Sequence, residues 1–243
     1  MNKKVLIAIC CVMVLLIIIV YALILKSHNS DEKIIEEAVS ENIIIKEKVV
    51  KYENSKQQID TVIPEIQNLD AEYVNYFNTK MYDEISSENV YKASIEGYQA
   101  EEIGFFTYEA KYNRYNSDDY ISIVIDQYIH LGDGRPKLQK KCYVIDARRS
   151  VTPTLMDVFE NKVNYKKAII NEINKQATQS NIELIGGNGL KELGDLQAFY
   201  IKDGKLVIYF EASEIAATAV GELEFIMPFE MVNGRFVLWE KKI

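Results

Sequence analysis

The sequence predicts an α+β fold, with an antiparallel β-sheet of two meanders packed by two helices and preceded by a single N-terminal transmembrane helix. Three observations support this prediction: an uncharged apolar run near the N-terminus, two apolar stripes at spacings of three and four, and two groups of strand-like runs separated by turn residues. Their order is β, α, β-meander, α, β-meander, which is typical of helices packed on one face of an antiparallel sheet.

Residues Val5–Leu25 form the apolar run, which contains 21 residues and no charged residue, Pro or Gly. A helix of this length spans a hydrocarbon core of about 30 Å, because each residue adds about 1.5 Å. Lys3 and Lys4 precede the run and acidic residues soon follow it. We therefore expect a single-pass protein of the cell membrane with a cytoplasmic N-terminus and an extracytoplasmic C-terminal domain. The alternative is a signal peptide cleaved near Ala22, after which the remainder would be secreted.

The predicted parts of the chain are a cytoplasmic stub at residues 1–4, the anchor at residues 5–25, a stalk at residues 26–48 and an extracytoplasmic domain at residues 49–243. Within the stalk, Ile34, Ile35, Ala38 and Val39 recur at helical spacing, which indicates a short stalk or the membrane-proximal end of a helix. The domain is long enough for one large folding unit or two small ones.

The first part of the domain is predicted to contain strands followed by one helix. Residues 43–63 have extended character before Pro64. Asp70 is a good N-cap for the helix that follows. The apolar stripe of this helix consists of Val74, Phe77, Met81 and Ile85.

A first meander follows this helix. Its strands are predicted at Phe105–Arg114, Tyr120–His130 and Lys141–Asp146, with turns at residues 116–119 and 132–134. In the second strand, isoleucines at positions 121, 123, 125 and 129 alternate with polar residues such as those at 122, 126 and 130. This alternation indicates a strand with one buried face and one exposed face.

A second helix and a second meander complete the predicted domain. The helix is expected at Tyr165–Ala177, with Asn164 as its N-cap. The strands of the meander are predicted at Phe199–Ile201, Leu206–Phe210, Glu222–Met227 and Phe236–Trp239. Asp203-Gly204 lies between the first two strands and is a strong signal for a type I′ hairpin.

The chain is acidic, with 36 Asp and Glu against 28 Lys and Arg and a net charge of −8. Leaving out Lys3, Lys4 and Lys26 beside the anchor leaves 25 basic residues against the same 36 acidic ones, a net charge of −11 for residues 27–243. Nucleic-acid binding requires a basic surface, so we expect no nucleic-acid partner. The charge suits a cationic partner, because complementary fields speed encounter, and it also serves solubility.

We find no catalytic, cofactor-binding or metal-binding constellation in the sequence, and no nucleotide-binding or hydrolase motif. Cys142 is the one cysteine outside the anchor, and its apolar neighbours predict a buried inert thiol. The two histidines, His28 and His130, lie too far apart in the predicted fold to share a metal. We therefore expect a noncatalytic protein without a cofactor. The alternative is a cell-wall enzyme that uses carboxylates, or an accessory subunit of a cell-envelope complex.

Tyrosine is abundant, and a cluster of five follows the first meander at Tyr108, Tyr112, Tyr115, Tyr120 and Tyr128. Aromatic residues on sheets usually pack in the core or on the sheet surface. The alternative is that this meander forms a binding face, with Tyr112, Tyr120 and Tyr128 as candidate contacts.

From Leu155 onward the chain resembles a known family. The residues that carry the resemblance are Leu155–Phe159, the helix from Tyr165, Phe199-Tyr200, Asp203-Gly204, Val207–Phe210, Glu214–Ala216, Ala219, Gly221, Phe225 and Pro228. They resemble the extracytoplasmic domain of the lysozyme-sensing anti-sigma factors of the sigma-V type, and a related domain accompanies some membrane-bound peptidoglycan deacetylases. The resemblance covers about Val49–Val237 and is densest in Leu155–Pro228.

The resemblance implies a binding or sensor-type module for a cell-wall component such as peptidoglycan, or for a cationic wall-active protein such as lysozyme. It adds Gly132, Asp133, Gly134 and Glu214 to the candidate binding residues, at the family's glycine-rich turn and Glu-Ile-Ala core. The histidine that the family often carries in this turn is absent here, and its Pro-Tyr pairs are replaced. Because four residues precede the anchor, we expect no direct binding of a sigma factor.

Overall fold

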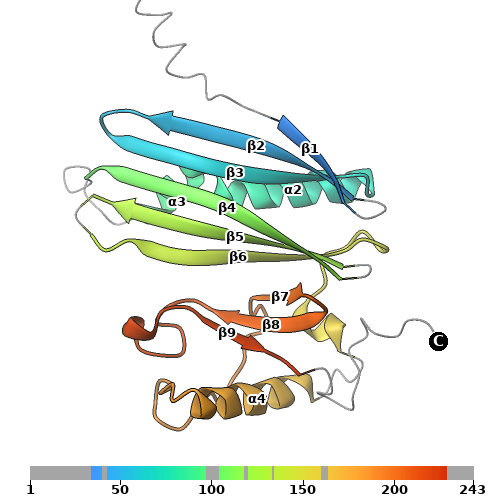
Figure 1. Cartoon of the computed structure of the whole chain (residues 1–243), viewed down its shortest axis with the longest axis vertical. Coiled ribbons are helices and arrows are strands. Elements are labelled where there is room, and N and C mark those ends of the chain that lie inside the picture. The colour runs from blue at the N-terminus through green and yellow to red at the C-terminus, as the bar shows by residue number, and fades with distance from the viewer. Residues whose placement is uncertain are drawn as a thin grey trace, which may run out of the picture.

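The structure is a computed structural model that describes residues 34–39, 43–96, 104–117, 120–132, 134–159 and 164–228. The described residues form two β-sheets with their helices, which follow one another along the long axis of the molecule (Figure 1). We call residues 34–150 the N-terminal unit and residues 151–228 the C-terminal unit. The predicted α+β class is confirmed, with two sheets in place of the one that was expected.

The N-terminal unit contains a six-stranded sheet in which the strands lie side by side in chain order. The strands are β1 (Ile34–Val39), β2 (Ile43–Glu53), β3 (Gln57–Gln67), β4 (Phe106–Ser117), β5 (Tyr120–Leu131) and β6 (Lys137–Asp146). All neighbours are antiparallel except β3 and β4, which run parallel with Gln57 opposite Phe106 and Thr61 opposite Ala110. The prediction of an antiparallel sheet is therefore wrong at this pair. Parallel neighbours need a crossover connection, and two helices between β3 and β4 supply it.

The stalk prediction is wrong for residues 34–39, which form strand β1 and pair with β2 from Ile34 opposite Lys48 to Val39 opposite Ile43. Apolar residues in so short a run fit the helical and the extended period equally well, so pairing with a neighbouring strand decides between them. The anchor predicted at Val5–Leu25 and residues 26–33 lie outside the described part of the chain. Among the residues that are described, no helix is long and apolar enough to cross a membrane.

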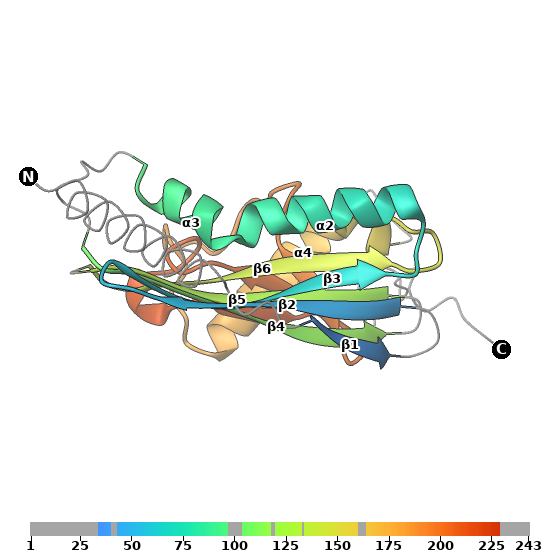
Figure 2. The same ribbon diagram turned by 90° about the horizontal axis from the view of Figure 1, so that it is seen from above.

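Helices α2 (Ala71–Ile85) and α3 (Ser87–Ser94) lie along one face of the six-stranded sheet (Figure 2). The predicted N-cap is confirmed, because the Asp70 carboxylate accepts hydrogen bonds from the backbone N–H groups of Glu72 and Tyr73 at 3.1 and 3.0 Å. This cap satisfies two of the free donors at the start of α2 and sets where the helix begins.

The predicted apolar stripe of α2 faces the sheet. Phe77, Met81 and Ile85 are buried, and Val74 is half-buried. The residues of β5 that pack with them are the predicted isoleucines Ile121, Ile123, Ile125 and Ile129. Spacings of three and four on a helix therefore meet alternate positions of a strand to form the first hydrophobic core.

The C-terminal unit contains a three-stranded antiparallel sheet with the order β7-β8-β9. Its elements are η2 (Leu155–Val158), α4 (Tyr165–Gln179), β7 (Phe199–Lys202), β8 (Lys205–Phe210), η3 (Thr218–Val220) and β9 (Leu223–Ile226). Asp203 and Gly204 connect β7 to β8 with φ values of 50° and 69°, as a type I′ turn requires, so the predicted hairpin is confirmed. The strand predicted at Phe236–Trp239 lies outside the described residues.

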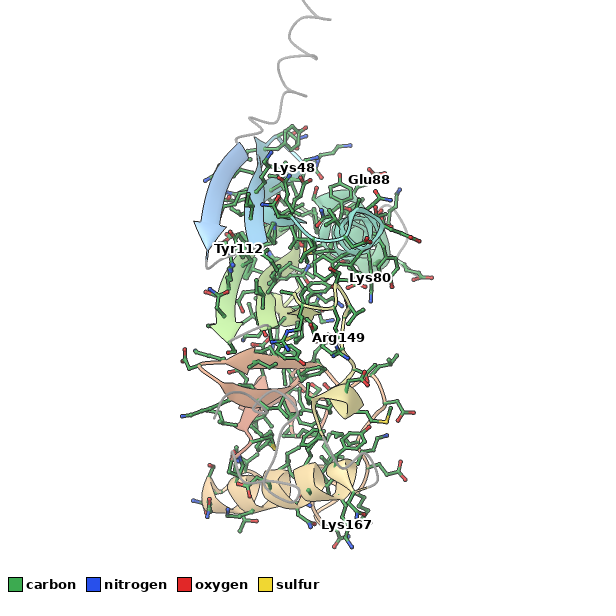
Figure 3. The ribbon with its side chains drawn as sticks, turned by 90° about the vertical axis from the view of Figure 1, so that its right-hand side faces the viewer. Lys48, Lys80, Glu88, Tyr112, Arg149 and Lys167 are labelled. Carbon is green, nitrogen blue, oxygen red and sulfur yellow. The ribbon has the colours of Figure 1, made fainter. Side chains whose placement is uncertain are left out.

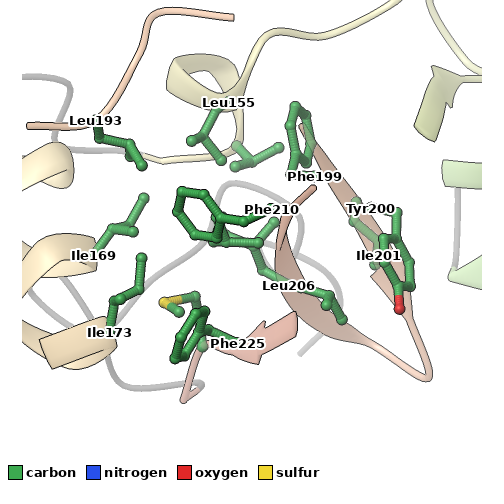
Figure 4. Close-up of a cluster of buried hydrophobic side chains, with 14 of the residues drawn as sticks. Leu155, Ile169, Ile173, Leu193, Phe199, Tyr200, Ile201, Leu206, Phe210 and Phe225 are labelled. Atoms are coloured by element: carbon green, nitrogen blue, oxygen red, sulfur yellow. The ribbon is translucent and has the colours of Figure 1, made fainter. Parts of the chain in front are cut away.

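Helix α4 packs on the three-stranded sheet and not on the larger one, which explains why there are two cores (Figure 4). Ile169 and Ile173 of α4 point toward Phe210 of β8 and Phe225 of β9. The two phenylalanine rings meet edge to face with their centroids 5.9 Å apart. The expectation that both helices pack on one sheet is wrong, because each sheet has one apolar face that needs its own cover.

The two units meet where β7 lies across the end of the large sheet. The backbone N–H of Ile201 donates to the Ser122 hydroxyl at 2.8 Å, and that of Gly204 donates to the Ser117 hydroxyl at 3.2 Å. The rings of Tyr115 and Tyr200 stack with centroids 5.7 Å apart. The face of β5 that was predicted to be exposed is therefore buried along its first half, because the C-terminal unit covers it.

Candidate functional site

The three tyrosines predicted as a binding face lie in three different environments. The Tyr112 hydroxyl donates to the Glu47 carboxylate at 2.7 Å (Figure 3). Tyr120 is buried in the second core, where the two units meet. Tyr128 lies opposite Glu109, on the sheet face opposite to that of Tyr112, and its ring is 6.4 Å from that of His130. The structure therefore does not bring these three side chains together.

The glycine-rich turn after β5 is held by a close approach of two backbone segments. A Cβ atom added to Gly132 would lie 2.6 Å from the Cα atom of Gly104, and Gly132 has a φ of 71°. The carbonyl of Gly134 lies 2.9 Å from the Nε2 atom of His130. Asp133 is outside the described residues. Glycine is required at position 132, because any other side chain would be strained at this φ and would clash with Gly104.

We expect Gly132→Ala to lower the free energy of unfolding by about 1–3 kcal/mol, because alanine is strained at this φ and clashes with Gly104. The matched control is Gly134→Ala, where an added Cβ meets nothing within 4 Å, and its effect is expected to stay within about 0.5 kcal/mol. Denaturant titration of the two full-length variants measures the difference. Equal effects of the two substitutions would contradict the close approach.

Glu214 lies in the loop after β8, where its carboxylate accepts a hydrogen bond from the backbone N–H of Glu211 at 2.8 Å. This loop lines an open groove of about 1220 Å³ between the two units. The residues around the groove are Tyr76, Lys80, Glu84, Lys140–Val144, Thr152–Leu155, Gly194–Phe199, Tyr209 and Glu211–Glu214. Among the predicted binding residues that the structure describes, Glu214 is the one that lines this groove.

The floor of the groove is the outer edge of β6. Lys140, Cys142 and Val144 line the groove, and β6 pairs with β5 on its other side in an unbroken antiparallel register. Burial raises the pKa of the Cys142 thiol to about 12, so the thiol stays protonated and unreactive at neutral pH. The predicted thiol is half-buried, and its raised pKa agrees with the expectation that it is inert.

Helix α2 forms one wall of the groove. Tyr76 is 58% exposed on this wall, and Lys80 lies one turn further along the helix (Figure 3). The Glu84 carboxylate accepts a hydrogen bond from the Tyr143 hydroxyl at 2.7 Å. Burial, and then the charge of Glu84, raises the pKa of Tyr143 above its ordinary value, so this hydroxyl remains a donor. This wall offers an aromatic ring and charges of both signs.

The C-terminal unit forms the opposite wall, which is acidic. Asp195, Glu211 and Glu214 lie on it, and Leu196 is 95% exposed beside Asp195. Asp195 pairs with Lys166 and Glu211 pairs with a lysine of β6, both at exposed positions where such pairs contribute little. Leu196 thus adds one exposed apolar side chain to a wall that is otherwise acidic.

At the end of the groove, Lys140 is surrounded by carboxylates from both units. Its Nζ atom lies 2.8 Å from Glu222, 3.5 Å from Glu224 and 3.6 Å from Asp126. The Tyr209 hydroxyl donates to Glu222 at 2.7 Å and accepts from the Lys140 backbone N–H at 3.0 Å. Burial alone would lower the pKa of Lys140, but the hydrogen bond to Glu222 and the neighbouring carboxylates raise it overall. The cluster therefore joins the two units beside the groove.

The groove has the chemistry of a binding surface, with hydrogen-bond donors, an exposed ring and an acidic wall. Within the described part of the chain, no group of three or more His, Cys, Asp and Glu residues is placed to hold a metal ion. The carboxylates along the groove are each engaged by a lysine, a tyrosine or a backbone N–H.

Residues 156–230 match the family described as "Protein of unknown function (DUF3298)". The match begins in η2 and contains α4, the three-stranded sheet and the Glu214 loop, so it coincides with the C-terminal unit. The segment in which the family resemblance is densest, Leu155–Pro228, is thus the segment that carries a DUF3298 match. No curated protein matches the chain.

Two solved structures are similar to the chain. A DUF3298 family protein from Pseudomonas aeruginosa PAO1 has 12% sequence identity and a TM-score of 0.51, with 85% of this chain and 95% of that chain covered. A member of the same family from Bacteroides fragilis has 13% identity and a TM-score of 0.49, with 86% and 95% covered. The likeness to the Pseudomonas protein shows a shared fold that extends beyond the C-terminal unit into the large sheet.

Most of the groove could not be found from the sequence. Its walls come from α2, β6 and the loops before β7 and after β8. These segments carry no shared motif, and Tyr76 and Glu214 are 138 positions apart in the chain (214 − 76). The one signal within the sequence was the Glu-Ile-Ala segment of the family resemblance, which pointed to Glu214. Leu196 stands in a loop, where an isolated apolar residue has no distinguishing pattern.

Proposed function

We propose that this chain is a membrane-anchored, noncatalytic extracytoplasmic binding module of the sensor type. Its proposed ligand is a cationic wall-active protein such as lysozyme, or a cell-wall component such as peptidoglycan. The observation that carries the proposal is the groove between the units, with its acidic wall and exposed Leu196. The resemblance to lysozyme-sensing domains makes lysozyme the first ligand to test, and the apolar run Val5–Leu25 supports the anchor.

Charge supports a cationic ligand over a neutral one. Asp195, Glu211 and Glu214 lie together on one wall, and residues 27–243 carry a net charge of −11. A positively charged protein would be attracted over a distance of about one Debye length, or about 8 Å at physiological salt. We therefore expect affinity for lysozyme to fall steeply as the salt concentration rises.

The test is a titration of the full-length chain in lipid nanodiscs with lysozyme and, separately, with soluble peptidoglycan fragments. We expect binding of at least one ligand at micromolar concentration, and release of no new fragments from peptidoglycan. Absence of binding by both ligands at up to about 100 μM would overturn the proposal. Release of fragments that depends on Glu84 or Glu214 would favour a cell-wall enzyme instead.

A variant with Glu211→Gln and Glu214→Gln localises the binding to the groove. We expect its affinity for the bound ligand to be about fivefold lower, because two carboxylates of the acidic wall lose their charge. Glutamine keeps the carbonyl that accepts the Glu211 backbone N–H, so the loop is expected to remain folded. The matched control is Glu183→Gln, at an exposed position outside the groove, and it is expected to leave the affinity unchanged.

A further inference from the structure

We infer that the groove binds an extended polypeptide segment, with basic side chains at alternate positions, by adding it as a further strand to the outer edge of β6. This inference rests on the proposed binding function and specifies the chemistry of the ligand at that site. Strand addition obtains its affinity from backbone hydrogen bonds and its specificity from alternate side chains.

Every second residue of β6 directs its backbone N–H and C=O groups toward the groove. The Lys140 N–H donates outward to the Tyr209 hydroxyl, and the Asp146 N–H donates outward to the carbonyl of Val151. In an antiparallel strand, the residues that point away from the partner alternate, and the register between β5 and β6 is unbroken. Cys142 and Val144 therefore also direct their N–H and C=O groups away from β5.

These two residues have no outward hydrogen-bond partner among the described residues, whereas their neighbours at both ends do. Tyr209 occupies the edge at Lys140, and Val151 occupies it at Asp146. Between these two points the edge lines the open groove. Two successive outward-facing positions without a backbone partner, on a strand edge that lines a groove, indicate a site for strand addition.

The walls of the groove define the side chains of the added strand. Successive side chains of a strand point to opposite faces of the sheet, so one set would face α2 and the other would face the C-terminal unit. The second set would meet the carboxylates of Asp195, Glu211 and Glu214, which favour lysine or arginine. The first set would meet the ring of Tyr76, which favours an aliphatic or cationic side chain.

A second copy of this chain fits the groove less well than a basic segment. Pairing of two β6 edges would bring the acidic wall of one copy against the same acidic wall of the other, and like charges across an interface are unfavourable. Charge complementarity therefore selects a basic polypeptide as the occupant.

The experiment measures backbone amide exchange of the full-length chain in nanodiscs by NMR, with and without a capped peptide of about eight residues in which Lys alternates with Val or Thr. We expect the amides of Cys142 and Val144 to exchange at least about tenfold more slowly when the peptide is bound. The amide of Tyr143 points toward β5 and is protected in both states, so it serves as an internal control.

Two further peptides carry N-methyl groups at odd or at even positions and keep every side chain. One of them blocks the edge that faces β6, so we expect it to bind at least about tenfold more weakly while the other binds normally. Equal binding of the two methylated peptides overturns strand addition. A peptide with Glu in place of Lys is expected to bind at least about tenfold more weakly, and equal binding overturns the basic specificity.

The outcomes separate this inference from the proposed function. If lysozyme or peptidoglycan fragments bind through Glu211 and Glu214 while the Cys142 and Val144 amides stay unprotected with every ligand, the binding function stands and strand addition is overturned. If no ligand binds at all, both fail. Protection that rises with protein concentration in the absence of peptide identifies a second copy as the occupant and also overturns the inference.

Discussion

Replacing Phe210 with alanine is expected to lower the free energy of unfolding by about 3–5 kcal/mol, the largest effect that we predict for a single side chain. Phe210 lies on β8, is 1% exposed, and packs edge to face with Phe225 in the second core (Figure 4). Its removal loses the burial of an aromatic ring and leaves a cavity that the surrounding α4 and β-sheet side chains cannot fill without strain.

The matched control is Phe105→Ala, since Phe105 is the same residue type but is 38% exposed before β4. Its substitution is expected to cost less than about 1 kcal/mol. Denaturant unfolding of the full-length chain, followed by far-ultraviolet circular dichroism, measures both variants. Similar midpoints for the two variants would show that Phe210 is not packed in the second core.

The Phe210 variant also tests whether the two units unfold together. The second core contains Tyr120, Val124 and Val144 from the large sheet as well as the residues of the C-terminal unit. Because the units share these buried residues, we expect one cooperative transition at a lower denaturant concentration. A second, unshifted transition from the large sheet would show that the N-terminal unit is stable on its own.

The second large effect is expected for Lys140→Met, which keeps the aliphatic stem and removes the charge. Lys140 and Glu222 are only 21% and 20% exposed, and they connect the two units beside the groove. Loss of the ammonium group leaves three carboxylates close together without their shared cation. We expect a loss of about 2–3 kcal/mol, somewhat less than for a fully buried pair, because about a fifth of each side chain reaches solvent.

The stabilisation by Lys140 is also expected to depend on pH. Since the pKa of Lys140 is raised in the folded state by Glu222 and its neighbours, the ion pairs stabilise the fold fully below the ordinary lysine pKa of 10.5. This contribution is lost as the pH rises from that value through the folded-state pKa. The difference in stability between the wild type and Lys140→Met is therefore expected to be constant from pH 7 to pH 10 and smaller above it.

The control for the charge is Lys92→Met on α3, which breaks an exposed ion pair with Glu88, four positions earlier in the chain. Such exposed pairs contribute little to stability, because water screens both charges. Urea titrations at several pH values compare the two lysine variants. An effect of Lys140→Met no larger than that of Lys92→Met would refute the role assigned to the carboxylate cluster.

Local signals in the sequence predicted most of the individual elements. The Asp70 cap, the stripe of α2 and the Asp203-Gly204 turn each depend on residues within a few positions of one another, so their conformations follow from short-range sterics and hydrogen bonds. The stalk residues 34–39 were mispredicted for the opposite reason, because their strand exists only through pairing with β2.

The predicted site depended on contacts that no local pattern contains. Tyr112, Tyr120 and Tyr128 form a group in the sequence, yet strand alternation and the covering C-terminal unit place them in separate environments. Glu214 was predicted as a binding residue from the family resemblance and not from the residues next to it in the sequence. Residues of both units line the groove, so it depends on how the units pack and not on any single segment.

The sequence by itself determined the α+β class, the acidic charge, the apolar run Val5–Leu25 and the positions of most helices and strands. Only the tertiary structure decided that the chain forms two sheets, that β3 and β4 run parallel and that the edge of β6 faces an open groove. Periodicity reports which face of an element is apolar, but not which other element covers it. That choice is made by long-range packing, and here it also creates the site where we propose that a ligand binds.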